Sequence, residues 1–318
     1  MHLGVDLGTT RVAVATRSKG IVLRMPALVA ADRNSGRIVA VGEEAQKLLA
    51  QPAGSIVPVR PLRDGAVASR EAAEAVLEAC LKKVRGLPLS RPDVWVSVPS
   101  EVTPVERRGV VEAALAAGAR RAHSVPAPLA AAVGAGLQVE EPEGLMVVDI
   151  GGGCSDVGVI SLRSVVVPGT IRVGGNRMDE AVGRMLRRVH NLMAGEATVE
   201  NLKLQLGSAL PSGENRTLDI NGQDLVDGLP RTVTVTEEEV RSALEEPLIQ
   251  IVDGLRAVLE RTPAELSGDI YRSGILLTGG AARLRGLDQL LERLLGVPTR
   301  LAAQPEDCVA LGAARLGG

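Results

Sequence analysis

One unit of the hydrophobic pattern occurs twice along the chain. An apolar run at 2–7 ends in a glycine turn and is followed by a second apolar run at 11–16, and the stretch 145–161 repeats this order. In each copy an aspartate, Asp6 or Asp149, stands two residues ahead of a glycine. Apolar runs bounded by glycines predict buried strands joined by tight turns. A repeat at a distance of about 140 residues indicates two similarly built halves.

Helical patterns fall between these strands. Residues 69–85 carry apolar side chains at helical spacing, and we expect the last helix at about 307–316. The segments 103–106 and 236–239 are both capping boxes, in which a threonine precedes a glutamate by three residues. Strands that alternate with helices in both halves place the chain in the α/β class.

Two further turns are indicated. Asn221-Gly222 precedes the strand-like residues 231–236 and predicts a hairpin turn. Residues 274–280 predict a buried strand that ends in Gly279-Gly280, with a helix after it.

Composition excludes some function classes. The chain has 318 residues with no Phe, one Trp and one Tyr, and its formal net charge is −2. It therefore lacks both the rings that stack on bases and a basic field, so we expect no nucleic-acid partner. Three widely spaced cysteines, Cys80, Cys154 and Cys308, are typical of free thiols in a reducing cytoplasm. The pattern leaves no room for a leader before the first strand, and residues 126–137 are too short and too rich in Gly and Pro to span a bilayer.

The glycine turns suggest a phosphate site. A glycine turn after a buried strand lets backbone N–H groups approach an anion closely. Neither the Walker pattern nor the dinucleotide fingerprint is present. Two such turns that face each other would clamp a phosphate chain, and Asp6 and Asp149 would hold a hydrated Mg²⁺ beside it.

These segments resemble a known family. GVDLGTTRVAVAT, MVVDIGGGCSDVGVI and GILLTGGAARLRGL are similar to the phosphate and adenosine motifs of the actin, Hsp70 and sugar-kinase superfamily. VSVPSEVTPVERRGVVEAALAAGA, GLPRTVTVTEEEVRSALEEPL and other stretches between about 2 and 316 resemble the MreB-type bacterial actins. The resemblance implies an actin-like fold of two ribonuclease H-like domains around a cleft that binds ATP or ADP with Mg²⁺. It also implies head-to-tail filaments that act with other cell-shape proteins, in the cytoplasm and peripherally at the inner face of the cell membrane.

The resemblance also implies domain bounds and site residues. Domain I would be 1–138 with 305–318 and an insertion at about 30–65, and domain II would be 139–304 with an insertion at about 177–245. Asp6 and Asp149 would be the catalytic, magnesium-side carboxylates. The nucleotide contacts would be Gly8, Thr9, Thr10, Arg11, Gly151, Gly152, Gly153, Cys154, Glu200, Lys203, Gly279 and Gly280.

Four positions depart from the family pattern. Ala127 stands where the family has the glutamate that orients the attacking water, and Cys154 stands where it has a threonine. Arg11 and Asn176 replace the usual Asn and Asp, and Arg11 either reaches a phosphate or lies on the surface. A methyl group neither orients nor deprotonates water, so we expect nucleotide binding with weakened hydrolysis, unless another residue supplies the water contact.

Two polar residues near the site have competing interpretations. Glu106 would be a replacement base or simply the last residue of the first capping box, and we favour the cap. Cys154 would be a nucleophile only with a base beside it, and none of the three histidines forms a motif with it.

The stretch 84–91 is the candidate membrane contact. Leu87 and Leu89 would enter the interface of an anionic membrane, and the flanking cations Lys82, Lys83, Arg85 and Arg91 would add attraction. The alternative is an ordinary helix–strand connection with two half-buried leucines. Other functions also remain open at this point, namely a non-polymerising pseudo-actin that regulates or caps filaments and a small-molecule kinase of the same superfamily.

Overall fold

Two five-stranded sheets of the same topology form the frame of the molecule. The computed structural model describes residues 1–50, 54–84 and 91–317. In each sheet three antiparallel strands are followed by two that run parallel to the first of them. The first sheet has the order β3 (Gly20–Pro26), β2 (Arg11–Thr16), β1 (His2–Leu7), β9 (Asp93–Val98), β10 (Arg121–Pro126). The second has the order β13 (Ser164–Ile171), β12 (Ser155–Ser161), β11 (Leu145–Ile150), β17 (Ile275–Thr278), β18 (Thr299–Leu301). The predicted internal repeat and the α/β class are therefore confirmed.

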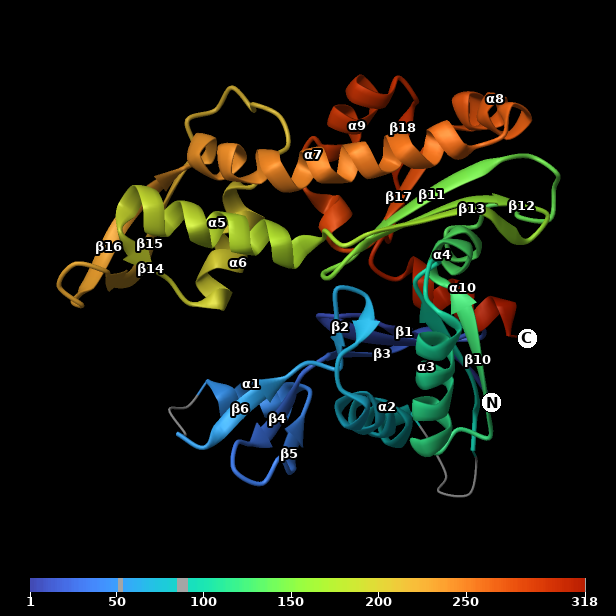
Figure 1. The fold of residues 1–318 in the computed structure, drawn as a ribbon, viewed down its shortest axis with the longest axis horizontal. Coiled ribbons are helices and arrows are strands. Elements are labelled where there is room, and N and C mark those ends of the chain that lie inside the picture. Colours follow the sequence, from blue (N-terminus) through green and yellow to red (C-terminus); the bar gives the residue numbers. More distant parts are fainter. Residues whose placement is uncertain (51–53, 85–90, 318) are drawn as a thin grey trace.

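Two helices lie between the sheets and hold them together. α4 (Ala127–Gly134) and α10 (Cys308–Leu316) pack against each other, α4 on β11 and β12 and α10 on β1 and β2 (Figure 1). A Cβ atom at Gly134 would lie 1.8 Å from the carbonyl oxygen of Cys308, and one at Gly312 would lie 1.7 Å from that of Ala130. The Ala- and Gly-rich sequence at 126–137 thus serves close helix packing.

Further helices cover the outer faces of the two sheets (Figure 1). The first sheet carries α2 (Arg70–Val84) and α3 (Pro104–Ala116). The second sheet carries α7 (Glu237–Arg261), α8 (Ala264–Ser273), α9 (Leu287–Leu295) and the short 3₁₀ helix η1 (Ala281–Arg283). Beside it, α5 (Gly175–His190) and α6 (Glu196–Leu206) pack on each other and on α7. Both predicted capping boxes are present, Thr103 with Glu106 at α3 and Thr236 with Glu239 at α7.

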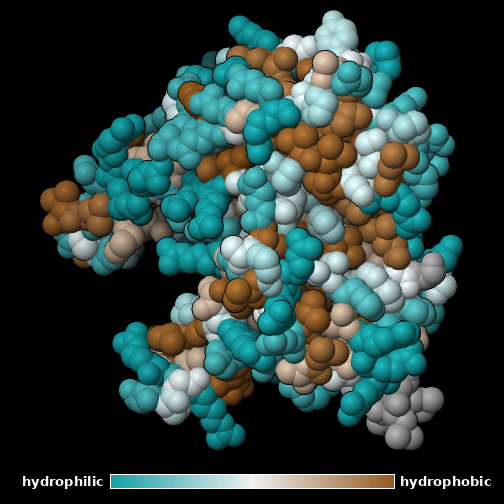
Figure 2. All heavy atoms as spheres, turned by 45° about the vertical axis from the view of Figure 1, so that its right-hand side comes forward, coloured by the Kyte–Doolittle hydropathy of each residue, from teal (hydrophilic) through white to brown (hydrophobic). Residues whose placement is uncertain are grey.

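Two arms project on the same side of the molecule (Figure 1). The lower arm contains β4 (Val29–Asp32), β5 (Ile38–Val41), α1 (Glu43–Leu49) and β6 (Ile56–Val59), followed by β7 (Leu62–Arg63) and β8 (Ala66–Val67). The upper arm ends in the sheet of β14 (Leu192–Met193), β15 (Thr217–Asp224) and β16 (Pro230–Thr236). Figure 2 shows hydrophobic surface at the tip of this arm, where Leu225, Val226 and Leu229 are exposed.

The hairpin prediction at Asn221-Gly222 is wrong. Both residues lie inside β15, and the turn follows at 225–229. A Cβ atom at Gly222 would lie 2.6 Å from the carbonyl oxygen of Met193 in β14. The glycine is therefore needed for the close approach of a neighbouring strand and not for a turn.

The core is aliphatic, as the composition requires. Val, Leu, Ile, Met and Ala fill one cluster under each sheet and a third around α4. Tyr271 is exposed, and Trp95 stacks on His123 at the edge of the first sheet. The three cysteines are free, in line with the sequence expectation. Within the described ranges, no helix has the length and apolar character that crossing a membrane requires.

Candidate functional site

A cavity of about 340 Å³ lies where the glycine turns of the two sheets meet. It brings together residues that are far apart in the sequence, from β1 and β2, from β11, from α5 and α6, and from the turn after β17. Of the residues expected from the sequence, it is lined by Asp6, Gly8, Thr9, Thr10, Arg11, Asp149, Gly151, Gly152, Glu200, Lys203, Gly279 and Gly280. Gly153, Cys154 and Ala127 line a second, adjoining cavity of about 90 Å³, which shares Asp6 and Asp149 with the first.

The two phosphate-type turns touch each other. A Cβ atom at Gly152 would lie 2.2 Å from Oγ1 of Thr10, and one at Gly153 would lie 2.3 Å from Oγ1 of Thr9. Only glycine allows the turn after β11 to approach the turn after β1 this closely. Residues of both turns line the larger cavity, so backbone N–H groups of both turns lie near the same space.

The third glycine turn packs against the second sheet. Gly279 has φ +88° and its position for a Cβ is 2.3 Å from the carbonyl oxygen of Ile150, so no other residue fits there without strain. Its N–H donates to the carbonyl oxygen of Pro305, which ties the turn to the segment that leads into α10.

Asp6 and Asp149 form a pair of carboxylates between the two cavities. Ser97 Oγ donates to Asp6 at 2.9 Å, and Thr278 Oγ1 donates to Asp149 at 2.8 Å. Burial raises the pKa of Asp6, and burial together with the neighbouring Asp6 raises the pKa of Asp149 to about 7. Two carboxylates that face one space without a cation are unfavourably placed when charged, and Mg²⁺ prefers such oxygen ligands. Among residues 1–50, 54–84 and 91–317, no three His, Cys, Asp or Glu side chains are grouped as a metal site.

A lysine and an aspartate stand together farther along the cavity. Lys203 Nζ lies 2.8 Å from Oδ1 of Asp179 and donates to the carbonyl oxygen of Gly175 at 3.3 Å. Burial raises the pKa of Asp179, against the effect of Lys203. Glu200 lies one helical turn before Lys203 on α6 and is exposed at the cavity. Asp179 was not among the residues predicted from the sequence. It lies four residues after Gly175 on α5, and both residues line the larger cavity.

Arg11 also lines the larger cavity. Its Nη2 donates to the carbonyl oxygen of Glu306 at 3.0 Å, and the Glu306 carboxylate is held by Arg283 through two hydrogen bonds of 2.9 and 3.0 Å. Arg11 is thus among the residues that line the cavity, and its contact with a phosphate stays a prediction.

Ala127, which stands where the resemblance implies a water-orienting glutamate, lines the smaller cavity. Ala127 is buried at the start of α4, and its methyl group is the whole side chain there. Cys154 lies against Gly65, whose Cβ position is 2.9 Å from the cysteine sulfur. Burial and the nearby acids raise the pKa of the Cys154 thiol far above its usual value, so the group stays protonated and unreactive.

Glu106 lines the smaller cavity, but its carboxylate takes part in the N-terminal cap of α3. Its carboxylate accepts from the backbone N–H and the hydroxyl of Thr103, both at 2.8 Å, and these bonds lower its pKa. A carboxylate whose pKa is lowered is a weaker base, which agrees with the cap interpretation.

Asp156 lines this cavity and connects the two sheets, a role that was not predicted from the sequence. It accepts from the backbone N–H and hydroxyl of Ser100, which follows β9, and from the Thr170 hydroxyl at 2.6 Å. The adjacent Glu101 accepts from the Thr170 N–H at 2.8 Å.

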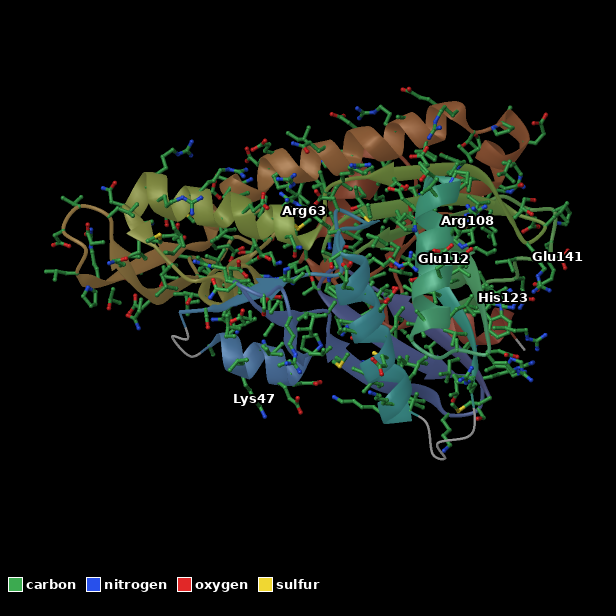
Figure 3. The ribbon with its side chains drawn as sticks, turned by 60° about the horizontal axis from the view of Figure 1, so that its bottom comes forward. Lys47, Arg63, Arg108, Glu112, His123 and Glu141 are labelled. Atoms are coloured by element: carbon green, nitrogen blue, oxygen red, sulfur yellow. The ribbon has the colours of Figure 1, made fainter. Side chains whose placement is uncertain are left out.

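A second contact joins β7 and its turn to α5. Figure 3 shows Arg63 of β7 beside the start of α5, where Asp64 Oδ2 and Arg177 Nη2 lie 4.0 Å apart. The contacts of Asp156 and of Asp64 therefore both join segments that are far apart in the sequence.

The remaining predicted residues are placed as follows. Asn176 accepts a hydrogen bond of 3.3 Å from Thr10 Oγ1, and its backbone N–H donates to the carbonyl oxygen of Gly152 at 2.8 Å, so it joins the two phosphate-type turns. Leu87 and Leu89 lie outside the described residues.

Known proteins are similar to this chain over nearly its whole length. The family described as MreB/Mbl protein matches residues 1–317. The chain is 43% identical over 312 residues to the cell shape-determining protein Mbl of Bacillus subtilis, which covers 98% of this chain and 93% of that protein. It is 42% identical over 316 residues to the cell shape-determining protein MreB of Escherichia coli, covering 98% and 91%.

Solved structures of other proteins have a similar fold. The crystal structure of MreB5 of Spiroplasma citri bound to ADP superimposes with a TM-score of 0.92 at 32% identity, over 99% of this chain and 95% of that chain. The same protein bound to AMPPNP gives the same values. A double helical filament of MamK has a TM-score of 0.84 at 23% identity and covers 99% and 98%, which supports the fold alone. The expected actin-like fold is confirmed, and this chain belongs to the MreB/Mbl family.

Proposed function

We propose that this chain is an ATP- and Mg²⁺-binding bacterial actin that forms filaments and organises cell shape and cell-wall growth. The observation that carries the proposal is the single cavity in which two phosphate-type turns, two carboxylates and a third glycine turn converge. A related protein of the same fold has been solved with ADP and with AMPPNP. Mg²⁺ held through water by Asp6 and Asp149 would neutralise phosphate charge.

The proposed residues have distinct roles. Backbone N–H groups of 8–10 and 151–153 bind the phosphate chain, and Gly279 and Gly280 pack on the nucleoside. Glu200 and Lys203 contact the ribose and base. Because most of these contacts come from the backbone, the exchanges at Ala127 and Cys154 should affect affinity less than hydrolysis.

The domain division is part of the proposal. Domain I comprises 1–138 and 305–318, with an insertion at about 30–65, and domain II comprises 139–304, with an insertion at about 177–245. The packing of α10 on β1 and the small sheet of β4, β5 and β6 support the first assignment. The sheet of β14, β15 and β16 supports the second. Nucleotide bound between the domains would fix their relative position.

We also propose that hydrolysis is slow. Ala127 leaves no side chain to orient or deprotonate the attacking water, and loss of such a group typically costs about 10²–10⁴-fold in rate. Glu106, which lines the same cavity, is held by Thr103. The protein would therefore bind ATP well and turn it over slowly.

Assembly and turnover are tested together. Light scattering and negative-stain microscopy with ATP, with ADP and without nucleotide would show filaments, and phosphate release per protomer would be measured beside them. Filaments with slow release support the proposal, and release at the rate of ordinary bacterial actins contradicts slow hydrolysis. A chain that binds nucleotide but assembles only with a competent bacterial actin would instead be a regulatory or capping pseudo-actin.

Membrane association is proposed from the sequence of 84–91. Leu87 and Leu89 would insert into an anionic membrane at the inner face of the cell membrane, and repetition along a filament would strengthen weak single contacts. Pelleting with anionic liposomes tests this. Equal pelleting of the wild type and a variant with Leu87→Ser and Leu89→Ser would exclude the loop as the contact.

A further inference from the structure

The Arg11 guanidinium is a cation in the cavity without an ion-pair partner. Among the residues that the structure describes, no carboxylate oxygen lies within 4.0 Å of its nitrogens. Its hydrogen bond goes to a neutral carbonyl, that of Glu306. A guanidinium is always charged, and a charge without an ion-pair partner in a partly enclosed site favours binding of an anion.

The strand register places Arg11 beside the magnesium-side carboxylates. Asp6 on β1 lies opposite Ala13 on β2, so both are on one face of the sheet. Arg11 is two residues before Ala13 and therefore on that same face, diagonal to Asp6. The charge of Arg11 acts on the Asp6 carboxyl group across this diagonal.

Glu306 holds Arg11 in place without neutralising it. Both oxygens of the Glu306 carboxylate are engaged by Arg283, so only the backbone carbonyl of Glu306 faces Arg11. The guanidinium has five N–H donors, and one interaction with a carbonyl leaves most of them available. A phosphate bound at the turn 8–10 would lie near these donors because Arg11 lines the same cavity as Gly8, Thr9 and Thr10.

We propose that Arg11 is a built-in counter-cation for the phosphate chain of the nucleotide, so that binding of nucleoside di- and triphosphates depends less on Mg²⁺ than it would without this side chain. The proposal rests on the nucleotide function above and adds a residue and a property to it. Arg11 and the metal ion would neutralise the same phosphates, so either one partly compensates for loss of the other. Charge-assisted hydrogen bonds of this kind typically change affinity by about 10- to 100-fold.

The experiment is calorimetric titration of the full chain with ADP, with ATP and with adenosine, each in Mg²⁺ and in EDTA. The test variant is Arg11→Gln, which removes the charge and keeps a polar side chain. The control is Arg188→Gln on the exposed surface of α5, which makes the same charge change away from the cavity. Thermal unfolding without nucleotide verifies that both variants are folded.

The expected result has two parts. R11Q weakens ADP and ATP binding by about 10-fold or more in Mg²⁺ and leaves adenosine binding unchanged. Chelation of Mg²⁺ with EDTA lowers the ADP affinity of R11Q by a larger factor than it lowers that of the wild type or of R188Q.

The contrary results are equally specific. The role of Arg11 would be overturned if R11Q bound ADP as tightly as R188Q, or if chelation of Mg²⁺ lowered ADP affinity equally in all three proteins. Either result would leave the nucleotide function itself intact. A wild-type chain that binds neither ADP nor ATP in Mg²⁺ would overturn the nucleotide function itself, and this inference with it.

Discussion

Asp149 on β11 and Asp156 on β12 lie directly opposite each other, so their carboxyl groups share one face of the second sheet. Each accepts a hydrogen bond from a threonine on its outer neighbour strand, Thr278 at 2.8 Å and Thr170 at 2.6 Å. Burial, which is the largest cause, raises the pKa of Asp149 to about 7 and that of Asp156 to about 6. This pair of acids makes the stability of the nucleotide-free protein depend on pH.

The free energy of unfolding of the metal- and nucleotide-free protein is expected to fall as pH rises from about 4 to above 7. Both carboxyl groups have a higher pKa in the folded chain than the usual 3.8, so the folded state binds more protons in this window. The stability that protonation supplies is complete below about pH 4 and is lost as pH rises through the folded pKa values. Urea titrations at several pH values in EDTA measure it.

Asp149→Asn is the matched variant for this prediction. An amide does not titrate, so the decline in stability between about pH 5 and 8 should become shallower. The same pH dependence in wild type and variant would show that Asp149 is not the source.

Ala127→Glu is expected to raise ATP turnover by about 10²-fold, the typical contribution of a water-orienting base. The residue begins α4, where a carboxylate is favoured by the helix dipole, and it faces a cavity of about 90 Å³. Phosphate release per protomer is the measurement. Ala127→Met fills the same space without a carboxylate and should leave the rate at the wild-type value; a rise in both variants would point to packing and not to a base.

Gly153→Ala is expected to weaken ADP binding by about 10-fold. A methyl group there would lie 2.3 Å from Oγ1 and 3.0 Å from Cβ of Thr9, so the two phosphate-type turns must move apart. Such overpacking typically costs about 1–3 kcal/mol. Gly268→Ala on α8 meets no atom within 4 Å and serves as the control in the same calorimetric titration. Equal ADP affinities would mean that contact between the turns is not needed for binding.

Glu106→Gln is expected to leave phosphate release unchanged, because glutamine also completes a capping box with Thr103. Thr103→Ala removes the cap and should lower the free energy of unfolding by about 1 kcal/mol, again without an effect on turnover. Urea titration and phosphate release on both variants measure the two effects separately. A large loss of turnover in the glutamine variant would assign Glu106 a catalytic role.

Features encoded within a few residues were predictable from the sequence. The capping boxes at 103–106 and 236–239 form because donor and acceptor are three residues apart. The repeated strand–turn–strand units were visible because buried strands and glycine turns leave a local pattern, and the turns at 8–10, 151–153 and 279–280 do lie at one site. The hairpin at Asn221-Gly222 failed because pairing of β15 with β14 and β16 overrides a local turn preference.

The sequence by itself determined the α/β repeat, the aliphatic core, the two helix caps and the residues of the glycine turns, because each depends on neighbours along the chain. Only the tertiary structure decided which side chains support the site. Ser97 reaches Asp6, Ser100 reaches Asp156, and Arg11 reaches the carbonyl of Glu306 across 295 positions. Such contacts depend on how two sheets and the helices between them pack, and a hydrogen bond between distant strands leaves no spacing in the sequence by which it could be read.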